Sequence, residues 1–205
     1  RRPYPTTADV DGVAAARRSV TDAIGTAALV SGTLSAGWLA SMLAASILVP
    51  RHRLWPIERL TIGNQLSIWL PTILVFVASF ILGVLDWNAL GWPACRRWGV
   101  GGTLVLLGNL VVWTAFFRLG PARTSGAAGA LETGGFYRWS RNPQYVADIA
   151  ILAGWAILCA VPATLPVIGL GISALILAPF AEEPWLRERH GRAFDDYCRK
   201  VRRFL

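Results

Sequence analysis

Long stretches without a single charged side chain constrain this chain more than any other feature of its sequence. Four such stretches cover residues 23–50, 60–85, 98–117 and 149–181. An α-helix needs about 20 consecutive apolar residues to cross the hydrocarbon core of a bilayer. Each of the first three stretches has the length of one crossing, so the sequence predicts a protein embedded in a membrane.

The fourth stretch is too long for one crossing and too short for two full ones. Pro162 and Pro166 interrupt it, and a proline in a helix interior removes a backbone hydrogen bond and clashes with the preceding turn. We therefore predict a helical hairpin that turns near residues 160–164. The expected fold is an all-α integral membrane bundle of about five transmembrane helices, of which the last two form a short hairpin.

This pattern divides the chain into three expected parts. Residues 1–22 form an N-terminal juxtamembrane segment, and residues 23–117 hold the first three transmembrane helices. Residues 118–205 hold a polar loop, the hairpin and a basic C-terminal tail.

The composition excludes several broad classes of protein. Hydrophobic residues make up 54% of the chain and charged residues only 16%, against about 25% charged residues in a typical soluble domain. A disordered chain would need low hydrophobicity and high charge. The net charge of +8 is also seen in nucleic-acid-binding proteins, but here the basic residues lie between the apolar stretches. We expect no nucleic-acid partner.

The basic residues also predict how the bundle is oriented. Fourteen of the twenty Lys and Arg residues fall on the face that carries Arg51 and the C-terminal tail. Because cytoplasmic loops are enriched in Lys and Arg, we expect this face and the C-terminus in the cytoplasm, in a bacterial-type inner membrane. The arginine-rich tail is expected to bind anionic lipid headgroups. No obligate protein partner is inferred.

Metal-binding patterns are not found in the sequence. Cys95, Cys159 and Cys198 lie far apart, and His52 and His190 stand at no metal-ligand spacing. We therefore expect neither a disulfide framework nor a metal site.

Polar residues before the predicted hairpin are functional candidates. Polar side chains in or beside membrane helices cost free energy, so those that occur there commonly serve a function. Asn142 followed by Pro143 predicts a helix start, with the Asn142 side-chain oxygen capping the first turn. Tyr145 and Asp148 are separated by one helical turn, so they should share a helix face.

A second polar cluster follows the hairpin, where Glu182 and Glu183 are adjacent. We expect this pair at the C-terminal end of the second hairpin helix, where the helix macrodipole disfavours negative charge. A cationic partner is therefore expected. Arg138 or Arg141 can supply it as an ion pair, and a ligand with an ammonium or sulfonium group can supply it equally well.

The order of these residues resembles a known superfamily. The first motif reads Gly-Gly-Phe-Tyr137-x-x-x-Arg141-Asn142-Pro143-x-Tyr145, and the second reads Glu182-Glu183-x-x-Leu186-x-x-x-x-Gly191-x-x-Phe194-x-x-Tyr197-x-x-x-Val201. With the apolar hairpin between them, they resemble the integral membrane isoprenylcysteine carboxyl methyltransferases and phospholipid (phosphatidylethanolamine) N-methyltransferases. The resemblance covers residues 118–205.

This resemblance implies that residues 118–205 are the catalytic portion of a methyltransferase that uses S-adenosylmethionine and releases S-adenosylhomocysteine. The cofactor pocket would lie beside the hairpin, open to the cytosol and closed by the C-terminal segment, and the lipid acceptor would enter from the bilayer. Glu182 or Glu183 would hold the cofactor's amino group or ribose. By motif position, its other contacts would be Tyr137, Asn142, Pro143, Gln144, Tyr145 and the loop around Gly129 to Glu132, with Leu131, beside the adenosine.

The acceptor itself stays open at this point. An amine acceptor must be neutral when it attacks, and Glu182, Glu183 or Asp148 could take its proton. A carboxylate acceptor should instead be steered by an arginine, for which Arg141 and Arg187 are the nearest candidates.

Two departures from the carboxyl methyltransferases bear on this choice. Asn142 replaces their histidine, and Ala178 stands where they carry an arginine. A phospholipid amine and an isoprenoid or prenyl-type lipid are both retained as acceptors.

Two other classes of function remain as alternatives. Membrane sterol-type reductases have similar terminal helices and use NADPH, but they tend to be longer and carry more polar residues for the nicotinamide. A non-enzymatic transporter or scaffold is the second alternative. The sequence shows no inverted repeat of the kind common in transporters, and the terminal motifs argue against a plain scaffold.

Overall fold

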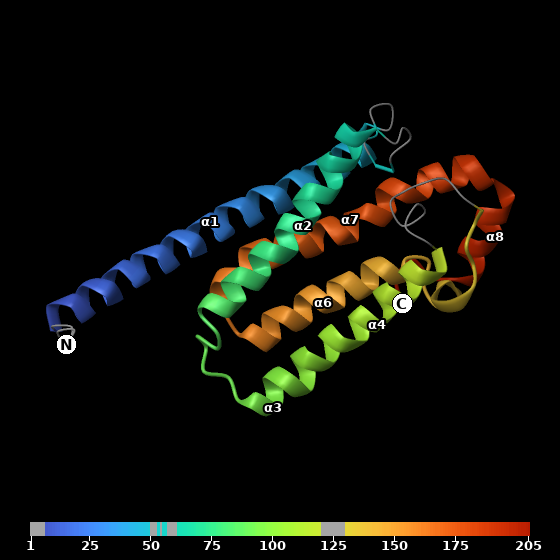
Figure 1. Ribbon diagram of the computed structural model, residues 1–205. Helices are drawn as coiled ribbons and strands as arrows, with labels where there is room; N and C mark the ends of the chain where they lie inside the picture. The colour runs from blue at the N-terminus through green and yellow to red at the C-terminus, as the bar shows by residue number, and fades with distance from the viewer. Residues whose placement is uncertain (1–6, 50–52, 54, 57–60, 120–129) are drawn as a thin grey trace.

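The computed structural model describes residues 7–49, 53, 55–56, 61–119 and 130–205 of the chain (Figure 1). Within this part the regular secondary structure is helical, with no strand. The long helices are α1 (Thr7–Leu48), α2 (Ile62–Leu85), α4 (Thr103–Leu119), α6 (Pro143–Cys159) and α7 (Leu165–His190). The shorter ones are α3 (Ala94–Arg96), the π-helix η2 (Arg97–Gly102), the 3₁₀ helices η3 (Gly135–Arg138) and η4 (Pro162–Thr164), and α8 (Arg192–Lys200).

The fold is a helical membrane bundle, as the sequence predicts. Among the residues that the structure describes, four helical segments are long and apolar enough to cross a membrane: Ala15–Leu48, Ile62–Leu85, Ala94–Phe117 and Pro162–His190. The fifth apolar helix, α6, has 17 residues and is therefore about 25 Å long, slightly less than the hydrocarbon core of about 30 Å.

The hairpin turns where the prolines predict it. Helix α6 ends at Cys159, Ala160 follows with a left-handed φ of 52°, and α7 starts at Leu165 after a 3₁₀ turn. Arg97 closes the end of α6, because its buried Nε donates a hydrogen bond of 2.8 Å to the carbonyl of Leu158.

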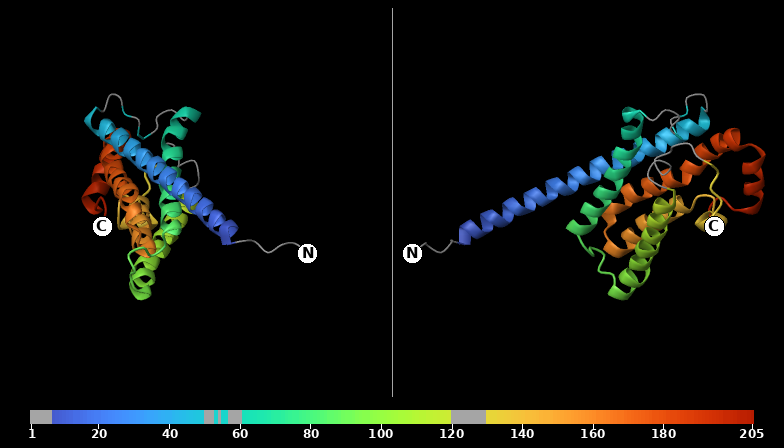
Figure 2. Two further views of the ribbon diagram at one scale, coloured as in Figure 1. Left: turned by 90° about the vertical axis from the view of Figure 1, so that its left-hand side faces the viewer. Right: turned by 45° about the vertical axis from the view of Figure 1, so that its right-hand side comes forward.

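Two helices are longer than the sequence predicts. Helix α1 starts at Thr7 and runs without a break past residue 22, and its first half extends away from the other helices (Figure 2). Our expectation that α7 ends at Glu182 and Glu183 is wrong, since this helix continues to His190. The pair therefore lies about two turns before the helix end, and the macrodipole argument for a cationic partner does not hold.

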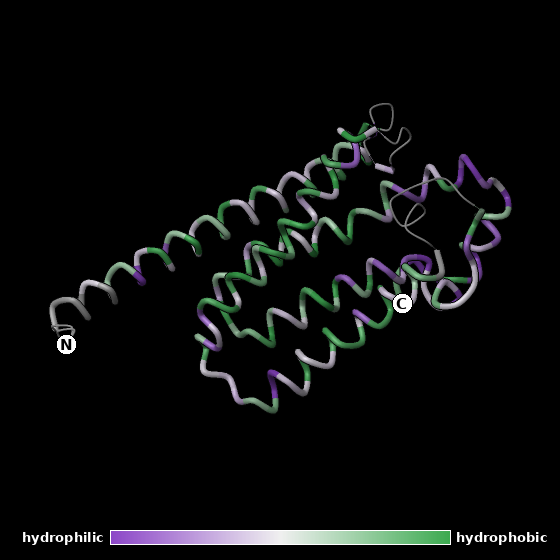
Figure 3. Tube along the Cα trace, viewed as in Figure 1, coloured by the Kyte–Doolittle hydropathy of each residue, from purple (hydrophilic) through white to green (hydrophobic). Residues whose placement is uncertain are grey.

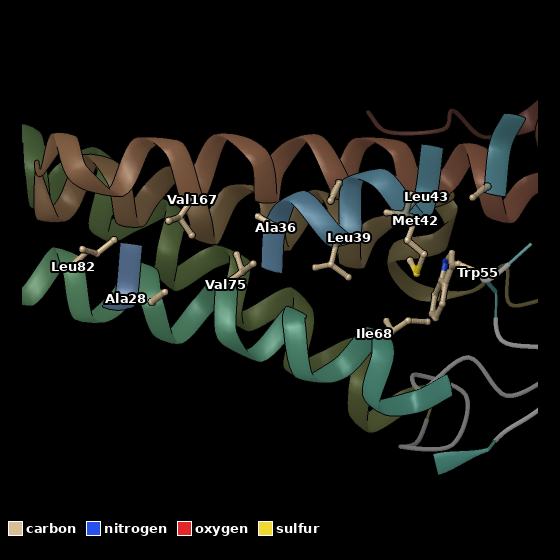
Figure 4. Close-up of a cluster of buried hydrophobic side chains, with 14 residues drawn as sticks. Ala28, Ala36, Leu39, Met42, Leu43, Trp55, Ile68, Val75, Leu82 and Val167 are labelled. Carbon is tan, nitrogen blue, oxygen red and sulfur yellow. The ribbon is translucent and has the colours of Figure 1, made fainter. Parts of the chain in front are cut away.

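The main apolar core lies between α1, α2 and α7 (Figure 4). Ala36 of α1, Val75 of α2 and Val167 of α7 are almost completely buried in it. Small residues let the helices approach closely: a Cβ on Gly32 would come within 2.6 Å of the Cβ of Ala78 and 2.9 Å of Val167.

A second interface packs η2 and α4 against α6. Here the glycines bring two backbones into contact, because a Cβ on Gly101 would stand 2.6 Å from the amide nitrogen of Leu158. A Cβ on Gly154 would likewise stand 2.8 Å from the carbonyl oxygen of Gly101. Such small-residue contacts are typical of helices that associate within a membrane.

Polar residues gather at one end of this bundle. Figure 3 shows hydrophilic residues concentrated around α8 and the neighbouring ends of α6 and α7, whereas the middle of the long helices is largely hydrophobic. The two sequence clusters that flank the hairpin therefore meet at one end of the fold.

Candidate active site

The start of α6 lies at this polar end, but Asn142 is used differently from our prediction. Pro143 occupies the first turn of the helix, as expected, and Asn142 is the N-cap residue by position. Its side chain makes no capping hydrogen bond; instead Nδ2 donates to the carbonyl oxygen of Arg203 at 3.0 Å. The expectation of a side-chain cap is wrong because the C-terminal segment, far away in sequence, passes close enough to accept this donor.

Glu183 is the anchor of that C-terminal segment. Both of its oxygens accept from Arg203, at 2.7 Å from Nη2 and 2.9 Å from Nε. Arg141 Nη2 donates to the same carboxylate at 2.9 Å, and the Glu183 side chain is almost fully buried. We call Arg141, Glu183 and Arg203 the C-terminal clasp. The ion-pair interpretation of the glutamate pair is thus confirmed for Glu183 and Arg141.

The clasp residues are also tied to the backbone around them. Arg141 Nη1 donates to the carbonyls of Cys198 and Val201, each at 3.1 Å, and the Arg141 amide donates to the carbonyl of Arg202 at 2.9 Å. The Arg203 guanidinium stacks over the ring of Phe180 at 4.0 Å, a favourable cation–π contact. The clasp therefore joins the start of α6, the interior of α7 and the chain beyond α8.

Tyr197 of α8 makes a further link across this end. Its hydroxyl donates to the carbonyl of Tyr137 at 2.6 Å, which ties α8 to the 3₁₀ turn before α6. Burial raises the pKa of the Tyr197 hydroxyl to about 12, because the charged phenolate would be poorly solvated.

Glu182 faces a different environment from its neighbour. Its Oε2 accepts a hydrogen bond of 3.2 Å from the hydroxyl of Tyr145, so α6 and α7 meet at this pair as the short hairpin predicts. Within the described residues no cationic side chain forms an ion pair with Glu182. Its second oxygen remains available to a ligand.

A cavity of about 820 Å³ lies beside this pair, within the range of small-molecule and cofactor sites. Its polar end is lined by most of the predicted site residues together with residues of α7 and α8. These lining residues are Leu131, Glu132, Tyr137, Arg141, Asn142, Gln144, Tyr145, Asp148, Glu182, Glu183, Trp185, His190 and Tyr197.

The other end of the cavity is apolar, and helices outside the hairpin contribute to its wall together with α6 and α7. Helix α2 contributes Trp69, Ile73 and Val77, and α4 contributes Trp113 and Phe116. Ile73, Val77 and Trp113 are 54%, 45% and 54% exposed even though they line the cavity. These three side chains therefore keep a large exposed area on helices that are long and apolar enough to cross a membrane.

The remaining predicted residues divide into those near the cavity and those outside it. Glu132 Oε1 accepts from the amide of Gly134 at 2.9 Å, so it helps to order the turn before α6. Pro143 is buried at the start of α6 and does not line the cavity, and Gly129 lies outside the described residues. Ala178, the position that lacks an arginine, lines the cavity from α7.

Several site residues were not singled out from the sequence. Arg203 is one of many basic residues in the tail, and nothing in its spacing sets it apart. Trp55 is buried against Met42 and Ile68 (Figure 4) and lines the cavity.

A metal site is not indicated in the part of the chain that the structure describes. No group of three or more His, Cys, Asp or Glu side chains there could hold a metal ion.

Comparison with known proteins gives one match. The family model described as phospholipid methyltransferase matches residues 97–193, a range that includes η2, α4, the hairpin and the Glu182–Glu183 pair. No curated protein and no solved structure matches the chain. The motifs on either side of the hairpin predict the same superfamily. The match places residues 97–193 in the phospholipid methyltransferase family, which belongs to the superfamily of integral membrane methyltransferases.

Proposed function

We propose that this protein transfers a methyl group from S-adenosylmethionine to a lipophilic acceptor that reaches the site from the bilayer. The observation that carries this proposal is the cavity of about 820 Å³, which joins a polar end at Glu182 to an apolar end between α2 and α4. A water-soluble cofactor suits the first end and a lipid chain suits the second. The membership of residues 97–193 in a family of membrane methyltransferases supports the same reaction class.

The residues at the polar end fit such a cofactor. S-adenosylmethionine supplies a methyl group activated on a positively charged sulfur. Glu182 offers a carboxylate that has no ionic partner within the described chain, and this carboxylate would bind the cofactor's ammonium group. Tyr145 would hold Glu182 in place through its hydroxyl, while Trp185 and Tyr137 offer aromatic faces at the cavity wall. Aromatic faces attract cations.

The protein's own contribution would be binding, orientation and exclusion of water. The clasp holds the segment after α8 against α6 and α7, so this segment would cover the polar end. The apolar walls of α2 and α4 would keep the lipid chain in one position relative to Glu182 and Asp148. We further propose that the polar end faces the cytoplasm, on the basis of the arginine distribution, and that the basic tail contacts anionic headgroups.

Ligand binding to the detergent-purified full chain tests this proposal. S-adenosylmethionine, S-adenosylhomocysteine and NADPH are titrated separately by calorimetry. We expect binding of the first two and none of NADPH. Binding of NADPH alone would move the protein to the sterol-type reductases, and binding of none of the three would contradict the methyltransferase proposal.

A radiolabelled transfer assay extends the test to the acceptor. Membranes that contain the protein are incubated with cofactor labelled in the methyl group, and the lipid extract is examined for label. Label in a lipid fraction supports the proposal, whereas label confined to water-soluble products contradicts a lipid acceptor. Membranes with the Glu182→Gln variant serve as the control.

A further inference from the structure

Two adjacent arginines lie at the end of the bundle away from the candidate active site. Arg96 ends α3 and Arg97 begins η2, and Figure 1 shows α3 far from α8. Both belong to the first turn of the apolar segment Ala94–Phe117, whose 24 residues span about 36 Å. Because this length exceeds the hydrocarbon core of about 30 Å, the first turn falls at the level of the lipid headgroups.

Arg97 is a buried charge without a counter-ion. Its side chain is 6% exposed, and its guanidinium carbon lies 4.5 Å from the centroid of the Trp87 ring. Nε donates to the carbonyl of Leu158, but Nη2 is buried and has no hydrogen-bond partner among the described residues. No carboxylate in that part of the chain forms an ion pair with Arg97. Burying a charge without a paired anion is unfavourable, so the contacts within the protein leave this arginine incompletely satisfied.

Arg96 adds a second positive charge at the same place. Its side chain is exposed, and its guanidinium carbon lies 4.0 Å from the centroid of the Trp92 ring. Asp86, the C-cap residue of α2, is the one acidic residue in the connection that runs from residue 86 to residue 97. Within the described residues it forms no ion pair with either arginine. The connection therefore presents two guanidinium groups that no carboxylate neutralises.

Exposed indole rings flank the two arginines. The rings of Trp87 and Trp98 lie 6.2 Å apart between centroids, and their side chains are 40% and 58% exposed. Tryptophan is enriched at the boundary between the hydrocarbon core and the headgroups of a bilayer. A small anion would use the arginines alone, whereas a phospholipid also covers the indole rings with its glycerol and upper acyl carbons. The surface therefore fits a lipid better than a free anion.

We propose that Arg96 and Arg97 bind the phosphodiester of an anionic phospholipid in the leaflet at this end of the bundle. The phosphate pairs with the exposed guanidinium of Arg96 and places negative charge beside Arg97. A zwitterionic headgroup would bring a cation toward two arginines, so a headgroup with net negative charge is favoured. Because Arg97 also closes α6 through the Leu158 carbonyl, the bound lipid stabilises the turn of the hairpin. This site is separate from the cavity and does not depend on the proposed function.

A fluorophore on Cys95 reports lipid binding at this position and not elsewhere on the protein. Cys95 is exposed next to Arg96, Cys159 is buried, and Cys198→Ala removes the remaining thiol. The labelled full chain is reconstituted in phosphatidylcholine vesicles with increasing amounts of a quenching lipid, either phosphatidylglycerol or phosphatidylcholine with a nitroxide on the same upper acyl carbon. One arginine near anionic lipid gives about a fivefold preference. We therefore expect half-maximal quenching at an about tenfold lower fraction of the phosphatidylglycerol probe. Equal quenching curves would overturn the proposal.

Variants assign the preference to the two arginines. The double variant Arg96→Gln, Arg97→Gln should quench equally with both probes. Arg96→Gln alone should lose part of the preference without affecting the fold, because its side chain is exposed. The matched control is Arg17→Gln, Arg18→Gln, which removes two exposed charges from the part of α1 that extends away from the other helices (Figure 2). A preference that persists in the double variant, or that disappears in the control, would overturn the assignment.

Thermal unfolding in detergent distinguishes a lipid from a free anion. The delipidated full chain is unfolded with phosphatidylglycerol, with phosphatidylcholine or with inorganic phosphate. We expect phosphatidylglycerol to raise the thermal midpoint by about 2–4 °C over phosphatidylcholine, as for a modest gain in stability in a chain of this size, and by less in Arg96→Gln. The same rise with inorganic phosphate would show that a free anion suffices and would overturn the lipid proposal. An equal rise in Arg96→Gln would overturn it as well.

Discussion

The guanidinium of Arg203 holds both oxygens of Glu183, at 2.7 and 2.9 Å, whereas the neighbouring Glu182 bonds only to Tyr145 within the described chain. Adjacent residues on a helix point about 100° apart, so Glu183 can reach the C-terminal segment while Glu182 points elsewhere, although both line the cavity. The two glutamates therefore have separate roles. Glu183 organises the structure, and Glu182 is available to a ligand.

Replacing Glu183 with glutamine should destabilise the protein. Removing one partner of a buried ion pair leaves uncompensated charge on Arg141 and Arg203, which costs about 3 kcal/mol. We expect a lower thermal midpoint in detergent and faster proteolysis after α8. Asp196→Asn is the control, because Asp196 and its partner Arg199 are both exposed and such pairs contribute about 0–1 kcal/mol. A stable Glu183→Gln variant that has lost only cofactor affinity would contradict the clasp.

Replacing Glu182 with glutamine should lower cofactor affinity and leave stability nearly unchanged. The hydrogen bond from Tyr145 can be kept by the amide oxygen, so the thermal midpoint should change little. Cofactor affinity should fall by about tenfold or more, the value of a hydrogen bond between charged groups. Calorimetry with S-adenosylhomocysteine measures this directly, and unchanged affinity would remove Glu182 from the site.

The contact between η2 and α6 gives a test of the fold itself. Gly101→Ala places a methyl group 2.6 Å from the amide nitrogen of Leu158, and backbone atoms cannot move aside cheaply. We expect a loss of about 1–3 kcal/mol, as for other overpacked contacts. Gly99→Ala, in the same π-helix, meets nothing within 4 Å and should be neutral. Thermal unfolding of both variants in one detergent is the measurement, and equal midpoints would argue against this interface.

Alkaline pH should loosen α8 through Tyr197. The pKa of its hydroxyl is about 12 in the folded protein and about 10 in an unfolded chain. Between these values the folded state binds more protons than the unfolded state, so stability falls as pH rises. The contribution is intact below about pH 10 and is lost between about pH 10 and 12. In the Tyr197→Phe variant the thermal midpoint should decline less steeply with pH in that window. Identical slopes in the variant and the wild type would contradict the role of Tyr197.

The hairpin and the meeting of its flanking motifs could be predicted because they depend on local signals. Pro162 and Pro166 interrupt an apolar run of defined length, and a short hairpin must return the chain to the surface where it began. The contact between Tyr145 and Glu182 follows from that geometry.

The course of α7 and the clasp could not be predicted in the same way. Pro184 disfavours a helix interior, yet α7 continues past it to His190. Arg203 is indistinguishable in sequence from the other arginines of the tail. The role of Arg203 depends on its contact with Glu183, twenty residues earlier. It also depends on the hydrogen bond that the Asn142 side chain donates to the Arg203 carbonyl.

The union of a polar and an apolar end in one cavity has a consequence for enzyme kinetics. Its two ligands would arrive from different phases, one counted per volume of water and the other per area of bilayer. Adding inert lipid at constant total acceptor would then slow turnover by surface dilution, while half-saturation by the water-soluble ligand stays where it was. The turnover rate would then depend on the volume concentration of one ligand and on the surface concentration of the other.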